Sequence, residues 1–224
     1  MNSAAVRVKI CGITNWPDAR TAINLGAEWL GFNFYPPSPR SLTPAQAWQI
    51  RRRMPRTAKA VGVFVNWSPE AVLALAQALD LAAIQLHGDE SPRQVAVCAR
   101  HCEVLKVFRV GPAFRLSSLA RYPAASAFLL DGFRPGLYGG TGRASNWSLA
   151  RRASRYGRIF LAGGLTPENV GGAILAARPY AVDVASGVES RPGKKDHDKL
   201  RDFFREVERA NRSLAAETRR SRAA

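Results

Sequence analysis

Short runs of β-branched and aromatic residues alternate along the chain with longer amphipathic stretches. Runs of the first kind are typical of buried strands, and apolar residues spaced three and four apart indicate helices. The predicted strands are Val6–Cys11, Trp29–Phe34, Ala60–Val65, Ala82–His87, Val104–Arg109, Ala127–Asp131, Ile159–Ala162 and Ala181–Ala185. The predicted helices are Trp16–Leu25, Pro44–Met54, Pro69–Leu79, Pro92–Arg100, the weaker Phe114–Arg121, Asn146–Arg155, Pro167–Ala176 and Asp196–Glu208.

Four of these helices begin with a hydroxyl residue followed by proline. A hydroxyl caps the first backbone N–H groups, and proline suits the first helical position because its φ is fixed and it has no N–H to leave unpaired. The pairs are Thr43-Pro44, Ser68-Pro69, Ser91-Pro92 and Thr166-Pro167.

Eight strands alternating with eight helices predict an α/β fold, the (β/α)8 or TIM barrel, with parallel strands inside and helices outside. A doubly wound open sheet is the main rival, but it more often carries a G-x-G-x-x-G turn after its first strand. The turn Cys11-Gly12-Ile13-Thr14 does not match that pattern. Because no break in composition divides the chain, we expect residues 1–210 to form one barrel domain. Residues 211–224 are expected to form a basic, disordered C-terminal tail.

Composition is that of a globular protein, with 46% hydrophobic and 22% charged residues among 224. No apolar stretch is long enough to span a bilayer, and the N-terminus lacks a secretory pattern. The three cysteines argue against a disulfide framework. Cys98 and Cys102 have no nearby His or Cys pair, so we expect ordinary packing rather than a zinc site. A cytoplasmic protein without a membrane partner is the expectation.

The formal charge of +16 is the main anomaly of the composition. It is compatible with a nucleic-acid partner, an anionic substrate or a basic solvated surface. The basic residues are scattered, and no nucleic-acid-binding module accompanies them, so the solvated surface is favoured and no nucleic-acid partner is expected.

Polar residues and glycines gather where the predicted strands end. In a barrel these positions share one rim, which is where chemistry takes place. A thiol at Cys11 and a carboxyl at Asp131 could exchange protons with one substrate, which suggests an acid/base enzyme. The other strand-end positions are Pro36–Arg40, His87-Gly88-Asp89, Arg109, Gly163-Gly164 and Ser186-Gly187.

Strand side chains alternate between two faces, so Lys9 shares its face with Cys11. By the same parity Asp131 goes with Leu129, His87 with Gln85, and Asp183 with Ala181. Near the thiol, the Lys9 ammonium would favour the thiolate. Near Asp131, it would instead lower the pKa of the carboxyl. The sequence leaves open which neighbour Lys9 serves.

An ordered set of motifs across nearly the whole chain resembles the phosphoribosylanthranilate isomerase family of tryptophan biosynthesis. The motifs are Lys9-Ile10-Cys11-Gly12-Ile13-Thr14, Ser38-Pro39-Arg40, Gln85-Leu86-His87-Gly88-Asp89-Glu90, Leu129-Leu130-Asp131 with Gly139-Gly140-Thr141-Gly142, Leu161-Ala162-Gly163-Gly164-Leu165 with Pro167-Glu168-Asn169-Val170, and Asp183-Val184-Ala185-Ser186-Gly187-Val188-Glu189 with Pro192-Gly193-Lys194-Lys195-Asp196.

The resemblance implies an Amadori rearrangement of N-(5-phosphoribosyl)anthranilate to 1-(2-carboxyphenylamino)-1-deoxyribulose 5-phosphate. Asp131 would be the general acid and Cys11 the general base, with no metal and no cofactor. Arg40 would bind the anthranilate carboxylate, and His87, Asp183 and Gly142 would contact other parts of the phosphosugar. The implied phosphate-binding residues are Gly163, Gly164, Ser186 and Gly187. The family occurs as monomers and homodimers, so either state is expected.

Two departures and two alternatives accompany this resemblance. Asn146 stands where the family usually has aspartate, which puts in doubt the anchoring of the predicted covering loop Gly139–Gly142. Gly132 follows Asp131 in place of the commoner alanine. The first alternative is a related phosphosugar isomerase, of the histidine pathway or with dual substrates, in which aspartate stands at the position of Cys11. The second is a basic barrel that binds nucleic acid.

Overall fold

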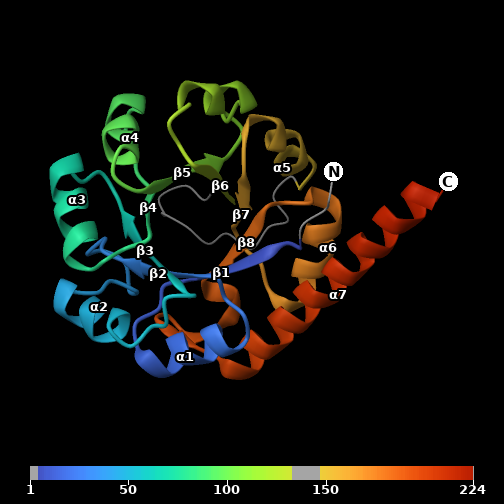
Figure 1. The fold of residues 1–224 in the computed structure, drawn as a ribbon, viewed down its shortest axis with the longest axis horizontal. Helices are drawn as coiled ribbons and strands as arrows, with labels where there is room; N and C mark the ends of the chain where they lie inside the picture. Colours follow the sequence, from blue (N-terminus) through green and yellow to red (C-terminus); the bar gives the residue numbers. More distant parts are fainter. Residues whose placement is uncertain (1–4, 133–146, 224) are drawn as a thin grey trace.

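Eight parallel strands close into a barrel in the computed structural model, which describes residues 5–132 and 147–223 (Figure 1). Each strand pairs with the next along the chain, and β8 closes the ring against β1. The predicted (β/α)8 barrel is therefore confirmed. The strands are β1 Arg7–Cys11, β2 Trp29–Asn33, β3 Lys59–Phe64, β4 Ala83–Leu86, β5 Glu103–Val110, β6 Ala127–Gly132, β7 Ile159–Leu161 and β8 Ala181–Val184.

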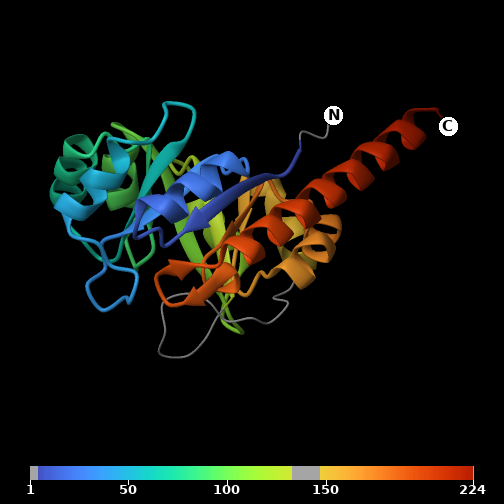
Figure 2. The ribbon, with the colours of Figure 1, turned by 90° about the horizontal axis from the view of Figure 1, so that it is seen from below.

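The helices surround the barrel, and a short antiparallel hairpin follows β8 (Figures 1 and 2). The helices are α1 Trp16–Asn24, α2 Pro44–Arg51, α3 Pro69–Ala78, α4 Pro92–Ala99, α5 Trp147–Ala153, α6 Pro167–Ala177 and α7 His197–Ala223, with 3-10 turns η1 Leu116–Arg121, η2 Ser154–Tyr156 and η3 Ser186–Val188. The hairpin strands are β9 Glu189–Arg191 and β10 Lys194–Lys195.

The predicted helix starts are confirmed at all four hydroxyl–proline pairs. Thr43, Ser68, Ser91 and Thr166 are the N-caps, each followed by proline in the first turn. The helix predicted over Phe114–Arg121 is instead the 3-10 turn η1, in which only Leu119 is buried. Pro123 follows closely, and the residue before a proline is disfavoured in the α conformation, so this segment is too short to form an α-helix.

Alternation along the strands divides the core into two layers. One face of each strand points into the barrel, where Trp29, Val61, Leu129 and Phe160 form an apolar floor. The rings of Trp29 and Phe160 meet edge to face, with centroids 5.0 Å apart. The opposite faces carry residues such as Ile10, which pack against the surrounding helices. Above this floor, toward the carboxyl ends of the strands, the inward-facing side chains are polar, and the candidate site lies there.

The C-terminal segment differs from the expected disordered tail. Helix α7 continues through residues 211–223 and projects beyond the rest of the molecule in both views (Figures 1 and 2). Leu214 is buried, continuing the apolar spacing of Val207 and Ala210. The Asn211 amide also accepts a hydrogen bond from Val6 N at 2.8 Å and donates one to Val6 O at 3.0 Å. Apolar packing and these bonds stabilise the helix beyond residue 210.

Leu214→Ala is expected to lower the free energy of unfolding by about 2–3 kcal/mol, because it removes a buried side chain. Urea denaturation measures the change. The control is Ser213→Ala, whose exposed side chain is expected to contribute within about 0.5 kcal/mol. Equal stability of the two variants would show that this end of α7 does not pack against the barrel.

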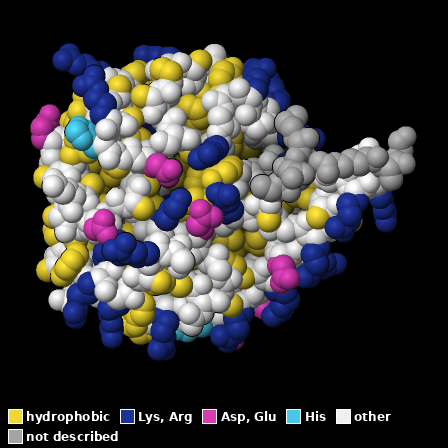
Figure 3. All heavy atoms as spheres, viewed as in Figure 1, with side chains coloured by type: hydrophobic (Ala, Val, Ile, Leu, Met, Phe, Trp, Pro, Cys, Tyr) yellow, Lys and Arg dark blue, Asp and Glu magenta, His cyan; other side chains and the backbone are white. Residues whose placement is uncertain are grey.

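Lys and Arg side chains are spread over the face of the molecule shown in Figure 3 and along α7. Several of those on α7 form ion pairs one turn away, such as Arg205 with Asp202 at 2.7 Å. Within residues 5–132 and 147–223, no helix has both the length and the apolar character needed to cross a membrane. Cys98 is a buried core residue, as expected, and burial raises the pKa of its thiol to about 11.

Candidate active site

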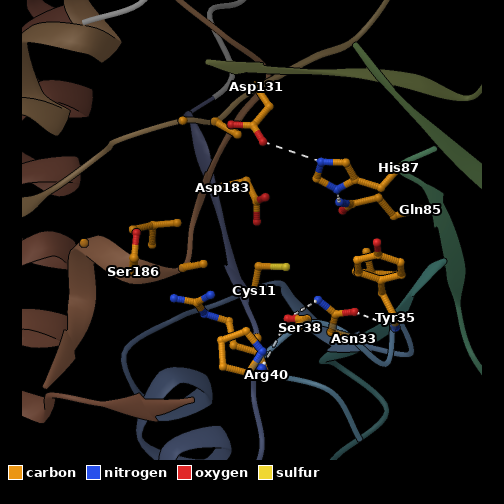
Figure 4. Close-up of a pocket in the computed structure, with 18 of the residues that line it drawn as sticks. Cys11, Asn33, Tyr35, Ser38, Arg40, Gln85, His87, Asp131, Asp183 and Ser186 are labelled. Carbon is orange, nitrogen blue, oxygen red and sulfur yellow. Dashed lines mark hydrogen bonds and ion pairs between the residues drawn. The ribbon is translucent and has the colours of Figure 1, made fainter. Parts of the chain in front are cut away.

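A cavity of about 460 Å³ opens among the carboxyl ends of the barrel strands (Figure 4). It brings together all the predicted site residues that the structure describes. They are Cys11, Arg40, His87, Asp131, Gly163, Gly164, Asp183, Ser186 and Gly187. The predicted contact Gly142, the covering loop Gly139–Gly142 and the departure at Asn146 lie outside the described residues.

Cys11 lies at the end of β1, above the buried ammonium of Lys9. Lys9 is fully buried, and its Nζ donates a hydrogen bond to Asp183 Oδ1 at 2.8 Å across the β1–β8 seam. Burial alone would lower the pKa of Lys9, but Asp183 and the Cys11 sulfur outweigh it and leave this pKa raised. Burial raises the pKa of the Cys11 thiol, which Lys9 opposes without cancelling. Lys9 therefore stays cationic, and Asp183 and Cys11 are the groups it serves.

Asp131 lies at the end of β6 and faces His87 across the cavity wall (Figure 4). Asp131 Oδ2 is 3.5 Å from His87 Nε2, too far for a good hydrogen bond. Gln85 Nε2 lies 3.1 Å from His87 Nδ1; with the amide as donor, the ring proton is on Nε2. Asp131 Oδ1 and His87 Nε2 are buried and have no hydrogen-bond partner among the described residues. Both atoms are thus available to a polar ligand in the cavity.

A buried ion pair behind the cavity supports the loop that carries His87. Lys106 Nζ donates to Glu90 Oε2 at 2.7 Å and to Gly88 O at 2.8 Å. Glu90 Oε1 accepts from the backbone N–H groups of Asn66 and Gly88 at 2.9 and 3.0 Å. Because every charge in this cluster is paired, the loop after β4 has a fixed path.

Gly163 and Gly164 form the turn between β7 and α6 in left-handed conformations, with φ of 86° and 69°. A Cβ at Gly163 would lie 2.2 Å from Gly132 N and 2.8 Å from Asp131 Oδ1. Asn169 holds the turn by donating from Nδ2 to Gly164 O at 2.8 Å. Glycine is therefore required beside Asp131, and its backbone lines the cavity next to Ser186 and Gly187.

Arg40 reaches the cavity from the loop after β2 and is held by Glu189. Its Nε and Nη2 donate to the two oxygens of Glu189 at 2.9 and 2.6 Å. Glu189 is nine-tenths buried, so the guanidinium has a fixed plane and a fixed position. The remaining Nη1 edge and one Nη2 N–H are not used by this pair.

Comparison with known proteins identifies the family of the chain. Residues 8–206 match the family model described as N-(5'phosphoribosyl)anthranilate (PRA) isomerase. A curated relative from Trichlorobacter lovleyi, N-(5'-phosphoribosyl)anthranilate isomerase, is 49% identical over 206 residues, covering 92% of this chain and 99% of that protein. The chain belongs to this isomerase family.

Two solved structures of the family have the same architecture. Phosphoribosyl anthranilate isomerase from Thermotoga maritima has a TM-score of 0.85 at 43% identity, covering 91% of this chain and 98% of that one. A second isomerase, in complex with reduced 1-(o-carboxyphenylamino)-1-deoxyribulose 5-phosphate, has a TM-score of 0.81 at 40% identity, with the same coverage. The suspected family membership is therefore confirmed.

Two polar residues of the cavity wall, Asn33 and Tyr35, were not singled out from the sequence. Asn33 ends β2 on the inward face, where its Oδ1 accepts from Tyr35 N at 2.8 Å and its Nδ2 donates to Ser38 Oγ at 3.1 Å. Asn33, Tyr35 and Ser38 all line the cavity. Asn33 is four residues after Trp29 on the same strand, so its side chain points to the same inward face. A polar residue at the inward end of a strand could therefore have indicated a cavity residue.

Gly31→Ala is expected to lower kcat/KM by about 10- to 100-fold, because the added carbon displaces the thiol. The new Cβ would lie 2.8 Å from Cys11 Sγ and 3.2 Å from Lys9 Nζ. Steady-state kinetics on the folded variant measure the effect. Gly171→Ala in α6 is the matched control, since its Cβ would meet nothing closer than 3.5 Å. Unchanged kinetics in Gly31→Ala would mean that the position of the thiol is not critical.

Proposed function

We propose that this protein converts N-(5-phosphoribosyl)anthranilate into 1-(2-carboxyphenylamino)-1-deoxyribulose 5-phosphate, a step of tryptophan biosynthesis. The observation that carries the proposal is that Cys11 and Asp131, from β1 and β6, line one cavity beside Arg40. In the view of Figure 4, Cys11 and Asp183 lie between Asp131 with His87 on one side and Arg40 on the other. A thiol, a carboxyl and a guanidinium are thus arranged around a space that suits a ribose with an aryl carboxylate.

The reaction needs one acid and one base. Asp131 gives a proton to the furanose ring oxygen, the C1–O bond breaks, and the nitrogen lone pair forms the C1=N bond of an iminium ion. Cys11, as thiolate, removes the proton from C2, and the C–H electrons form an enolamine. Tautomerisation of the enolamine gives the aminoketose. Each proton transfer of this kind contributes about 10²–10⁴-fold to the rate.

The remaining residues bind the two anionic ends of the substrate. The Arg40 edge not used by Glu189 takes the carboxylate through paired N–H groups. Gly163, Gly164, Ser186 and Gly187 line the part of the cavity after β7 and β8, where barrel enzymes commonly bind phosphate. His87 and Asp183 contact the sugar hydroxyls. The positive charge of the molecule would draw in a substrate that carries both anions.

The test is loss of anthranilate-type fluorescence when the purified protein meets the substrate without any added cofactor. Turnover supports the proposal, and no turnover by folded protein contradicts it. The histidine-pathway aminoaldose substrate forms the second arm. Comparable turnover of that compound would assign a dual-substrate isomerase instead. We expect the protein to act in the cytoplasm as a monomer or homodimer, a state that light scattering determines.

A further inference from the structure

The hairpin after β8 places a buried glutamate between two cations at the edge of the cavity. Glu189 holds Arg40 through two hydrogen bonds, and its Oε1 also accepts one from Lys195 Nζ at 3.0 Å. Lys195 is 2% exposed. Even when buried charges are paired, their desolvation cost can exceed their attraction, so this arrangement is not explained by stability alone.

Lys195 joins this cluster to the backbone that carries the thiol. Its Nζ also donates to Cys11 O at 2.7 Å and to Ala185 O at 3.1 Å, at the ends of β1 and β8. Its backbone N–H donates to Asp18 Oδ2 at 2.8 Å, and Asp18 is itself held by Asn15 Nδ2 at 2.7 Å. Lys195 is therefore fixed from several directions, and it links the Cys11 peptide to Glu189.

The stem of Arg40 is equally constrained. It lies across Gly12, where an added Cβ would be 2.5 Å from Arg40 Cδ. A continuous path thus runs from the Cys11 carbonyl through Lys195 and Glu189 to the guanidinium. The side chains of Arg40, Glu189 and Lys195 carry two positive charges and one negative charge, and three N–H groups of Arg40 are not used by Glu189.

We propose that Glu189 and Lys195 are positioning residues that fix the Arg40 guanidinium relative to Cys11 and so make the protein selective for ligands with an aryl carboxylate. This inference rests on the proposed function. With the guanidinium held at one place, a ligand whose carboxylate binds there has its sugar C2 at the thiol. A ligand without the carboxylate lacks this alignment and leaves the charge unpaired.

Two probes test the inference: the reduced product analogue, 1-(o-carboxyphenylamino)-1-deoxyribulose 5-phosphate after reduction, and the same compound without its carboxylate. The ratio of their dissociation constants is measured by fluorescence titration. The wild type is expected to prefer the carboxylate compound by roughly 10- to 100-fold, the range of hydrogen bonds to charged groups. Glu189→Asp keeps the charge but cannot reach both cations, and we expect the preference to fall by about tenfold or more.

Glu189→Gln separates position from charge. It raises the net positive charge of the cluster, so a purely electrostatic role predicts a stronger carboxylate preference, whereas a positioning role predicts a weaker one. This near-isosteric variant also decides the test if the shorter aspartate does not fold. The matched control is Glu90→Gln, which breaks the other buried Lys–Glu pair and is expected to cost stability without changing the ratio.

An unchanged or increased preference in folded Glu189 variants would overturn the positioning role while leaving the proposed reaction intact. Failure of the wild type to bind either probe would instead count against the proposed function itself. A ratio that falls equally in Glu90→Gln would reduce Glu189 to a general structural role and overturn the inference.

Discussion

Replacing Asp131 by asparagine is expected to lower kcat/KM by about 10²–10⁴-fold, because the amide cannot deliver a proton to the ring oxygen. The two side chains have nearly the same shape, so asparagine keeps the position beside His87 and Gly163. Binding of the reduced product analogue is expected to change little. The loss therefore falls on kcat rather than on KM, as steady-state and binding measurements can show.

A carboxylate at the same rim provides the control for that substitution. Asp89 follows β4, is mostly exposed and pairs with Arg109 at 2.9 Å outside the cavity lining. Asp89→Asn is expected to keep kcat/KM within about threefold of the wild type, since exposed pairs contribute little. Wild-type activity in Asp131→Asn would remove the general acid from the mechanism.

Cys11→Ser is expected to reduce kcat/KM by a similar factor and to remove the contribution of the thiol to its pH dependence. A base acts in its deprotonated form, and burial raises the pKa of this thiol. The wild-type profile also depends on the protonated general acid, so the thiol is best followed in Asp131→Asn. The residual activity of that variant should rise with pH through neutrality, about tenfold per pH unit, and continue to rise above the ordinary thiol pKa of about 8.5. Serine ionises far above this range, so the double variant Cys11→Ser/Asp131→Asn should show no such limb.

The pH profile of kcat/KM, recorded for Asp131→Asn and for the double variant across pH 6 to about 10, measures this difference. Gly171→Ala combined with Asp131→Asn serves as the control and should reproduce the profile of Asp131→Asn. An Asp131→Asn profile that is flat, or that falls with rising pH, would contradict the assignment of a thiolate base with a raised pKa. So would a double variant whose rising limb coincides with that of Asp131→Asn.

The inward positions could be predicted from the sequence because the repeat of a strand is two residues. This rule places Cys11 with Lys9, His87 with Gln85, and Asp131 with Leu129 from the sequence alone. The partner of Lys9 could not be obtained in this way. Asp183 lies 174 residues away, and only closure of the ring between β8 and β1 brings the two together.

The residues that hold Arg40 could not be predicted either, because Glu189 and Lys195 belong to a hairpin that no apolar periodicity marks.

The end of α7 was a different case. The spacing of Val207, Ala210 and Leu214 continues a helical stripe and was an available signal. The surrounding arginines and small residues favoured a tail, and the buried contact of Leu214 outweighs them.

The hydrogen bond from Lys195 to the Cys11 carbonyl has a consequence for biosynthesis of the polypeptide. Cys11 is translated 184 residues before Lys195, whose side chain anchors the Cys11 peptide. Until then the free edge of β1 has neither β8 nor the hairpin beside it, and unpaired strand edges are prone to misassociation. A nascent chain that stops short of Lys195 carries Cys11 and Asp131 but lacks the side chain that anchors the Cys11 peptide. We therefore expect premature termination to yield no partially active product.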